Sequence, residues 1–355
     1  MKKENKFLQF LKRKNIVISA KRYGIDALGA MAQGLFASLL IGTIIATAGE
    51  QFHLPFFVEA GGYAKAVAGP AMALAIGYAL QAPPLVLFSL LAVGNAANTL
   101  GGAGGPLAVL FVAIIAAECG KVVSKETKVD ILVTPAVTIL VGVAVSVLCA
   151  PTIGAAAQKV GDFIMWATDL QPFLMGILVS AVVGIALTLP ISSAAICAAL
   201  GLTGLAGGAA VAGCCAHMVG FAIMSFKENR WGGLVSQGLG TSMLQMGNIV
   251  KKPILFLPPI ITSMITGPLA TCLFKLEMNG PAVSSGMGTC GLVGQIGVYT
   301  GWVADVAAGT KDAITSMDWI GLVLICFILP GILTWLIGKL FRKVGLIKEG
   351  DLTLD

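Results

Sequence analysis

Four long apolar runs limit what this chain can fold into more than any other feature. They lie at residues 27 to 48, 131 to 149, 253 to 274 and 319 to 340. A helix rises ~1.5 Å per residue, so each run is long enough, or nearly so, to cross a hydrocarbon core of ~30 Å. Only 11% of the side chains are charged, against about 25% in a typical soluble domain. The sequence therefore predicts a membrane protein without a separate soluble domain.

The apolar segments are rich in alanine and glycine, and the chain has 45 glycines in all. Small residues let membrane helices pack closely, whereas a transmembrane barrel would show alternating segments of about ten residues. We therefore expect an all-α fold, a polytopic bundle of membrane helices.

Two shorter apolar runs, residues 67 to 81 and 172 to 189, end at the prolines of "QAPP" and "TLP". Proline breaks a helix because it lacks the N–H donor and clashes with the preceding turn. A glycine-punctuated hairpin follows each break, and each of its arms has only about 11 to 18 residues. The arms are either short crossings or re-entrant hairpins. We expect about ten membrane segments in total, glycine-rich re-entrant hairpins among them.

The two hairpins are related by a shift of 107 residues. The shift predicts a duplicated unit, about residues 27 to 118 and 131 to 225, with a C-terminal part at 253 to 340. Both units are expected to begin and end on the same side of the membrane, which makes the repeat parallel. The aligned pairs are Gly69 with Gly176, Gly77 with Gly184, Pro83 with Pro190, Gly94 with Gly201 and Gly101 with Gly208.

Lysine and arginine gather in four blocks that hold 19 of the 23 basic residues. Because basic loops face the cytoplasm, we expect both termini there and the loops with most of the acids, around residues 49 to 66, 150 to 171, 275 to 280 and 301 to 318, outside. The blocks lie at residues 1 to 26, 119 to 130, 226 to 252 and 339 to 355. The predicted domains are a basic amphipathic segment at 1 to 26, which lies on anionic membrane lipid, one membrane domain at 27 to 345, and a cytoplasmic tail at 346 to 355.

The stretch "SSGMGTCGLVGQIG" contains the pattern G-x-G-x-x-G at Gly286, Gly288 and Gly291. This pattern marks a dinucleotide-binding turn only inside a soluble parallel sheet, a context that this chain lacks. A related run after Pro190, "ISSAAICAALGLTGLAG", has a serine pair followed by G-L-x-G-x-x-G at Gly201, Gly204 and Gly207. The first stretch repeats this spacing at Gly291, Gly294 and Gly297. We therefore interpret the glycines as a packing or re-entrant motif rather than a cofactor site.

Polar residues at membrane depth are costly and are the default candidates for a binding site. Glu277 and Asn279 lead into the glycine-rich stretch, where a carboxylate and an amide can bind the hydroxyls of a sugar. His217 lies within an apolar hairpin arm and is either a ligand-binding residue or a structural one. The other candidates for substrate contact, which could equally join helices as interhelical hydrogen bonds, are Ser284, Ser285, Asn95, Asn98, Ser192 and Ser193.

No motif for catalysis or metal binding is present. The chain lacks H-E-x-x-H, the Walker loop and a nucleophile elbow, so no hydrolase or transferase is indicated. Its eight cysteines contain no C-x-x-C pair and are interpreted as small hydrophobic residues. We expect no cofactor, no metal and no nucleic-acid partner, and we expect transport or sensing of a solute.

Four runs of the sequence resemble a known family, the membrane-embedded EIIC proteins of the bacterial phosphotransferase system. The likeness covers about residues 15 to 345 and is strongest to the stand-alone branch that includes perfringolysin-regulator-like proteins. The runs are "KRYGIDALGAMAQGLFASLLIGTI", "GGAGGPLAVLFVAIIAAECGK", "LPISSAAICAALGLTGLAGGAA" and "NGPAVSSGMGTCGLVGQIG".

The resemblance implies a homodimeric permease of the bacterial plasma membrane that binds a small polar solute, a sugar above all, and moves it inward by alternating access. Phosphorylation would require separate EIIA and EIIB subunits, because their soluble domains are not in this chain. In glucose-type relatives a membrane histidine and a glutamate bind the sugar, and His217 and Glu277 are the positions that could match. The glucose-type motif G-I-T-E is replaced by "LEMNGP". The alternatives are a membrane-embedded sensor that regulates gene expression and a passive channel.

Overall fold

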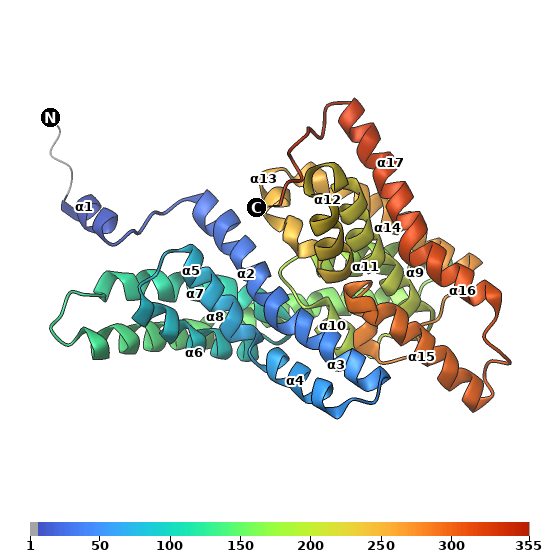
Figure 1. Ribbon diagram of the computed structural model, residues 1–355, viewed down its shortest axis with the longest axis horizontal. Coiled ribbons are helices and arrows are strands. Elements are labelled where there is room, and N and C mark those ends of the chain that lie inside the picture. Colours follow the sequence, from blue (N-terminus) through green and yellow to red (C-terminus); the bar gives the residue numbers. More distant parts are fainter. Residues whose placement is uncertain (1–5, 355) are drawn as a thin grey trace. The chain divides into compact units, whose positions relative to one another are not determined.

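The computed structural model describes residues 6–354, and this part of the chain is almost entirely helical (Figure 1). Its one β-type feature is an isolated antiparallel bridge between Gly204 and Met278. The expected all-α fold is therefore confirmed. The chain divides into two compact units, which are described separately: unit 1 covers Met1–Gly42 and Gly62–Ala155, and unit 2 covers Thr43–Gly61 and Ala156–Asp355.

Unit 1 contains the N-terminal helices and the first hairpin. Its elements are α1 (Lys6–Arg13), η1 (Arg22–Asp26), α2 (Ala27–Leu35), η2 (Phe36–Leu40), α5 (Ala68–Ala79), α6 (Pro84–Gly101), η3 (Gly102–Gly104) and α7 (Gly105–Val123). Three helices have residues in both units: α3 (Ile41–Gln51), α4 (Pro55–Ala66) and α8 (Asp130–Thr168).

Unit 2 contains the second hairpin and the C-terminal half. Its helices are α9 (Pro172–Thr188), α10 (Ser193–Ala199), α11 (Gly204–Met224), α12 (Phe226–Val235), α13 (Met246–Lys251), α14 (Leu257–Pro268), α15 (Val293–Ala308), α16 (Ser316–Val323) and α17 (Leu329–Lys343). Its 3₁₀ and π segments are η4 (Ser236–Gly240), η5 (Ser242–Gln245), η6 (Pro253–Phe256), η7 (Leu269–Leu273), η8 (Ala282–Gly286), η9 (Cys290–Leu292) and η10 (Leu324–Ile328).

Prolines set the helix breaks that the sequence predicted. Helix α5 ends at Ala79, and Pro83 then adopts an extended ψ of 157° as the N-cap of α6. Helix α9 likewise ends at Thr188, before Pro190. The shorter helices therefore have nearly the predicted bounds, because a residue that precedes proline is driven out of the α region.

Six helical stretches in the described part of the chain are long and apolar enough to cross a membrane. They correspond to the four predicted long runs, the α6–α7 hairpin and α11. Two shorter apolar helices, α5 and α9, accompany them. Apolar helices of this length support an integral membrane protein, while the count of about ten segments and the re-entrant hairpins stay predictions.

The prediction for residues 150 to 171 was an outer loop, and here the structure differs. Helix α8 continues as far as Thr168 with Pro135 and Pro151 inside it. The stretch after Pro151 reads "TIGAAAQKVGDFIMWAT", and its alanines are strong helix formers. A proline removes only one backbone hydrogen bond from a long helix, so the chain passes Pro151 without ending the helix.

Within unit 1, helices α5, α6 and α7 pack against one another (Figure 1). A Cβ atom added at Gly69 would lie 2.5 Å from the carbonyl oxygen of Gly94, so only glycine fits this crossing. The N-terminal segment is tied to the loop after α7, since Arg13 and Lys14 both pair with Glu126. The first five residues of the predicted amphipathic segment lie outside the described residues.

Within unit 2, helices α9, α11, α14 and α17 form the packed centre (Figure 1). Their crossings use small residues, as membrane helix interfaces commonly do. A Cβ atom at Gly213 of α11 would lie 1.9 Å from the carbonyl oxygen of Ser180 on α9, and one at Gly267 of α14 would lie 2.1 Å from that of Gly176. The alanine and glycine content of the sequence therefore serves close helix packing.

The C-terminal segment, predicted as a cytoplasmic tail, is anchored to unit 2 in its described part. The side-chain amide of Asn229 donates to the carbonyl oxygen of Leu352 at 2.8 Å and accepts from the backbone N–H of Leu354 at 2.8 Å. Gln245 and Asn248 donate to the carbonyl oxygens of Leu352 and Thr353. The side chain of Leu352 is completely buried, so this segment is part of the folded unit. Asp355 lies outside the described residues.

Candidate functional site

Two serine-glycine segments that share a sequence pattern lie against each other in unit 2. The first joins α9 to α11 through α10, and the second contains η8 and η9 before α15. Their hydrogen bonds are reciprocal. Ser193 donates to the carbonyl oxygen of Gly286 at 2.8 Å, and Ser285 donates to that of Leu202 at 2.6 Å. Each predicted serine pair thus supplies one side chain that holds the other segment.

Glycines allow the close approach between these segments. Gly288 has φ = +53°, and a Cβ atom there would lie 2.6 Å from the Cβ of Cys214 on α11. A Cβ atom at Gly286 would lie 2.5 Å from the carbonyl oxygen of Ser193. The third predicted glycine, Gly291, also has a positive φ of 52°, and a Cβ atom there would lie 2.2 Å from the side chain of Ile44. A side chain at any of the three positions would disturb the contact.

A polar cavity of about 450 Å³, which we call the carboxylate cleft, lies beside the second segment. Such a volume lies within the range of ~300–1,000 Å³ for small-molecule sites. It includes the predicted residues Glu277 and Asn279. The lining residues are Phe274, Lys275, Glu277, Asn279, Trp302, Asp305, Thr310, Lys311 and Asp318.

Asn279 organises the carboxylate cleft through both ends of its amide. Its Oδ1 accepts from the backbone N–H of Gly204 at 3.1 Å, at the start of α11. Its Nδ2 donates to Oε2 of Glu277 at 3.2 Å and to Oδ2 of Asp305 at 2.8 Å. The bridge between Gly204 and Met278 fixes the backbone on either side. The amide therefore holds two carboxylates close together, and the Glu277 side chain remains exposed.

The loop after α15 completes the cleft. The backbone N–H groups of Thr310 and Lys311 donate to the carbonyl oxygen of Asp305, which folds this loop back over the helix end. Lys311 then pairs with Asp318 at 2.9 Å. The cleft thus presents carboxylate acceptors beside an ammonium donor, a combination that can bind several hydroxyl groups at once. Trp302 is only 2% exposed, so its ring forms the wall and is not open for a sugar to stack on it.

A second polar group, the buried histidine cluster, lies deeper in unit 2 and consists of His217, Thr188 and Ser242. The side chains of all three are fully buried. Nδ1 of His217 lies 3.0 Å from Oγ1 of Thr188, which lies 2.7 Å from Oγ of Ser242. The imidazole makes edge contacts with the rings of Phe221 and Phe256. Its Nε2 is buried and has no hydrogen-bond partner among the described residues.

The structure does not bring His217 and Glu277 together. Asn279, the neighbour of Glu277, contacts Gly204 at the first residue of α11. His217 lies further along the same helix, and at ~1.5 Å per residue the span from residue 204 to 217 is about 20 Å. A single sugar ring is much shorter than this distance. The two positions therefore belong to different sites in this conformation.

The remaining predicted residues have local roles. Ser192 caps α10 by accepting from the backbone N–H of Ala195 at 3.2 Å. The buried Ser284 packs close to Gly297, where an added Cβ would lie 2.5 Å from its side chain. Asn95 and Asn98 lie on α6 in unit 1, whereas all the other predicted site residues lie in unit 2.

Sequence reasoning did not select Asp305, Lys311 or Trp302 as site residues. It placed Asp305 in the predicted outer loop at 301 to 318, among the acids there. The run "GWVADVAAG" could have indicated that Trp302 and Asp305 lie together, because residues three apart share a helix face. Trp302 and Asp305 do face one cavity from α15.

The comparison with protein families decides the class. The profile described as "Phosphotransferase system, EIIC" matches residues 25–354, nearly the whole chain. The chain belongs to this EIIC family. Neither the curated proteins nor the solved structures give a significant match. Family membership implies the membrane component of a sugar phosphotransferase system, which works with EIIA and EIIB components.

Proposed function

We propose that this EIIC protein binds a small polar solute, a sugar or sugar-like compound, in the carboxylate cleft and carries it across the membrane by alternating access. The observation that carries the proposal is the hydrogen bonding of Asn279 to both Glu277 and Asp305 at the edge of a cavity of about 450 Å³. Two carboxylates held close together are poised to accept hydrogen bonds from neighbouring hydroxyl groups.

The chemistry of the cleft favours a neutral polyhydroxyl compound over a charged one. Glu277, Asp305 and Asp318 supply negative charge, while Lys275 and Lys311 supply positive charge. Neither sign has a large excess, so a neutral solute avoids leaving a buried charge unpaired. A sugar matches this mixture of donors and acceptors.

Movement of the solute past the cleft would require the two serine-glycine segments to separate. The Gly204–Met278 bridge directly precedes Asn279 of the cleft, and Ser193 and Ser285 tie the two segments together. These hydrogen bonds are few and reach backbone carbonyls, so a rigid-body shift of one segment could exchange them. Alternating access about a site between helix ends is the general arrangement in secondary transporters.

The proposed setting is the bacterial plasma membrane, with both termini cytoplasmic and with a homodimer as the functional state. Separate EIIA and EIIB subunits would phosphorylate the solute on release. The second candidate function is a solute sensor that controls gene expression through the same cleft.

Uptake by reconstituted vesicles separates these functions. The purified chain is placed in vesicles and tested with a panel of radiolabelled hexoses and disaccharides. Each uptake assay is run with and without EIIB from the organism that encodes this chain. Saturable uptake of one sugar supports the permease. Binding without uptake under both conditions supports the sensor, and rapid flux that does not saturate would indicate a channel.

Variants then connect uptake to the cleft. Glu277→Gln and Asp305→Asn each remove a charged acceptor, and hydrogen bonds to charged groups contribute about 1.5–3 kcal/mol. We expect each variant to raise the half-saturation concentration at least about tenfold. Asp312→Asn is the matched control, because Asp312 is an exposed acid of the same loop that does not line the cleft. Uptake unchanged in both cleft variants would contradict the proposal.

A further inference from the structure

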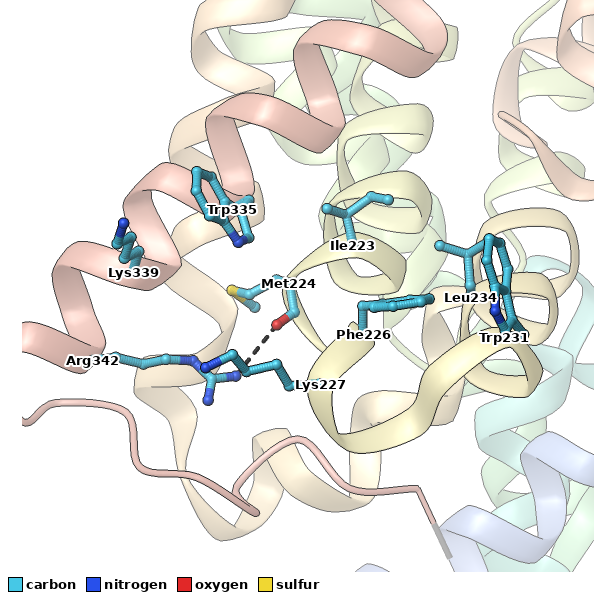
Figure 2. Close-up of a pocket in the computed structure, with 9 residues that line it drawn as sticks. All are labelled: Ile223, Met224, Phe226, Lys227, Trp231, Leu234, Trp335, Lys339 and Arg342. Atoms are coloured by element: carbon cyan, nitrogen blue, oxygen red, sulfur yellow. Dashed lines mark hydrogen bonds between the residues drawn. The ribbon is translucent and has the colours of Figure 1, made fainter.

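A cavity of about 650 Å³ lies away from the carboxylate cleft and shares none of its lining residues, so solute binding in the cleft does not explain it. It lies between the end of α11, α12 and the last turns of α17, and we call it the basic-aromatic pocket (Figure 2). Its side chains are of two kinds, large apolar groups and cations. The basic members are Lys227, Lys339 and Arg342, and the aromatic members are Phe226, Trp231 and Trp335.

An apolar groove continues this pocket along α17. A second cavity of about 300 Å³ shares Ile223 and Trp335 with the basic-aromatic pocket, and its other lining residues are all apolar or glycine. These are Phe327, Ile328, Gly331 and Ile332. The combined surface is therefore cationic at one end and purely apolar at the other.

Helix geometry explains the graded character of this surface. Residues 328, 332, 335, 339 and 342 follow each other at spacings of three or four, so they share one face of the helix. The span from residue 328 to 342 is about 21 Å at ~1.5 Å per residue. One leaflet, headgroup included, is about half of ~40–45 Å. The surface thus has the length of a single lipid molecule.

The charges at the cationic end of this surface are only partly neutralised. Arg342 pairs with Glu228 at 2.8 Å, and its Nη1 is buried without a hydrogen-bond partner among the described residues. Lys227 makes a long contact of 3.8 Å to Glu349, and both side chains are largely exposed. Lys339 lies over the ring of Trp335 at 5.1 Å, and no ion pair to it is found in the described chain. An anion would find at least one free ammonium group here.

Aromatic rings border the same end. Trp231 and Trp335 are 72% and 45% exposed, although each is large and apolar. Tryptophan prefers the headgroup level of a bilayer, where its ring is apolar and its N–H reaches polar groups. Figure 2 shows Trp335 and Lys339 on one wall and Trp231 on the opposite one. The rings thus lie where the polar and apolar parts of a lipid would meet.

From these observations we propose that the basic-aromatic pocket and the adjoining groove hold one anionic phospholipid. The headgroup phosphate lies near Lys227 and Lys339, and an acyl chain lies along Ile332 and Ile328. A basic pocket between membrane helices attracts anionic headgroups, and each lysine or arginine near the surface adds about 1 kcal/mol. The lipid would cover the exposed tryptophans and apolar side chains that unit 2 leaves open.

Tryptophan quenching in vesicles tests the proposal directly. The full chain is reconstituted into phosphatidylcholine vesicles that contain a small fraction of brominated phosphatidylglycerol or, in the parallel sample, brominated phosphatidylcholine. Subtracting the signal of Trp335→Phe isolates quenching at the pocket. We expect phosphatidylglycerol to quench Trp335 at least about tenfold more effectively per lipid than phosphatidylcholine, since two lysines attract it.

Charge variants separate a built site from general attraction to a basic surface. Lys227→Gln and Lys339→Gln should each lower the preference for phosphatidylglycerol about fivefold. Arg342 is left unchanged because it pairs with Glu228. The matched control is Lys343→Gln, which removes the same charge from an exposed position of α17 that does not line the pocket. Equal quenching by the two lipids, or an equal loss in the control, would overturn the proposal.

Discussion

Two positions of α11, its first residue and an interior one, place polar residues in opposite environments. At its first residue, Gly204 meets Asn279 and the carboxylate cleft, where the Glu277 side chain is exposed. Thirteen positions later on the same helix, from residue 204 to 217, His217 is fully buried, and its Nδ1 lies 3.0 Å from the hydroxyl oxygen of Thr188. The cleft can exchange its internal hydrogen bonds for those of a solute, whereas the buried histidine cluster is closed.

This contrast shows how a polar residue within an apolar segment should be judged. The free-energy cost of placing a polar side chain in a membrane made both His217 and Glu277 candidates for a binding site. Their partners separate them. Thr188, itself bonded to Ser242, satisfies one side of His217 inside the protein, while Asn279 leaves Glu277 with oxygen lone pairs that face an open cavity. Changes at His217 are therefore expected to affect stability, and changes at the carboxylate cleft are expected to affect binding.

The largest expected effect is at the glycine that lets the second serine-glycine segment approach α11. Gly288→Val combines a positive φ, which a β-branched residue rarely adopts, with a clash against Cys214. We expect the free energy of unfolding to fall by more than about 3 kcal/mol, measured by unfolding in detergent.

The control for this variant is Gly309→Ala. Gly309 has φ = +73° but nothing within 4 Å of an added Cβ, so only backbone strain of about 1 kcal/mol is expected. Equal destabilisation of the two variants would show that the clash with Cys214 is not what matters.

The next effect is at the buried histidine cluster. His217→Ala leaves a cavity beside Phe221 and Phe256 and removes the partner of Thr188. We expect a loss of about 2–3 kcal/mol in unfolding free energy. Thermal unfolding of the purified protein measures it. A variant as stable as the wild type would mean that the cluster is not a packing element. It would weaken the contrast between the buried histidine cluster and the carboxylate cleft.

A smaller, pH-dependent effect is expected where the C-terminal segment joins unit 2. Burial acts to raise the pKa of Asp351, but the hydrogen bonds from Lys252 and from the backbone of Lys348 prevail and hold it below its ordinary value. The ion pair therefore stabilises the fold above that ordinary value and is lost as the pH falls through the lower folded value. The gain is about 0.2–1 kcal/mol.

Asp351→Asn tests this effect in unfolding experiments at neutral and acidic pH. The variant should be less stable than the wild type at pH 7, and the difference should vanish in acid well below the ordinary carboxyl range. Lys252→Gln should give the same pattern, because it removes the other partner at 2.6 Å. A difference that persists in acid would contradict the assignment to this pair.

The smallest stability change is expected in the carboxylate cleft itself. Glu277 is exposed, and its side chain accepts a hydrogen bond from the amide of Asn279 at 3.2 Å. Surface substitutions usually change stability by less than about 0.5 kcal/mol, so Glu277→Gln should unfold like the wild type. A large loss of stability would place Glu277 with the packing residues.

Much of the helical framework could be predicted because its signals are local. Apolar runs bounded by prolines gave α5 and α9 nearly their observed bounds. The continuation of α8 past Pro151 was missed, since an internal proline resembles a helix end unless the following helix formers outweigh it.

The site could be predicted only in part because its contacts are distant in sequence. Glu277 and Asn279 were chosen from their place before a glycine-rich stretch, but Asp305 meets Asn279 across 26 positions. The buried histidine cluster is likewise built from other elements, since His217 meets Thr188 of α9, which in turn meets Ser242 of η5. Without their positions, a buried structural histidine cannot be distinguished from one that binds a ligand.

Equilibrium binding to the purified chain tests the central contrast most directly. Calorimetric titration with the sugar that gives saturable uptake compares the double variant Glu277→Gln/Asp305→Asn with His217→Gln, both below their unfolding temperatures. We expect the cleft variant to weaken binding about 100-fold, since two hydrogen bonds to charged groups are lost, and the histidine variant to change it less than about threefold. Weak binding in the histidine variant, with unchanged binding in the cleft variant, would contradict the account.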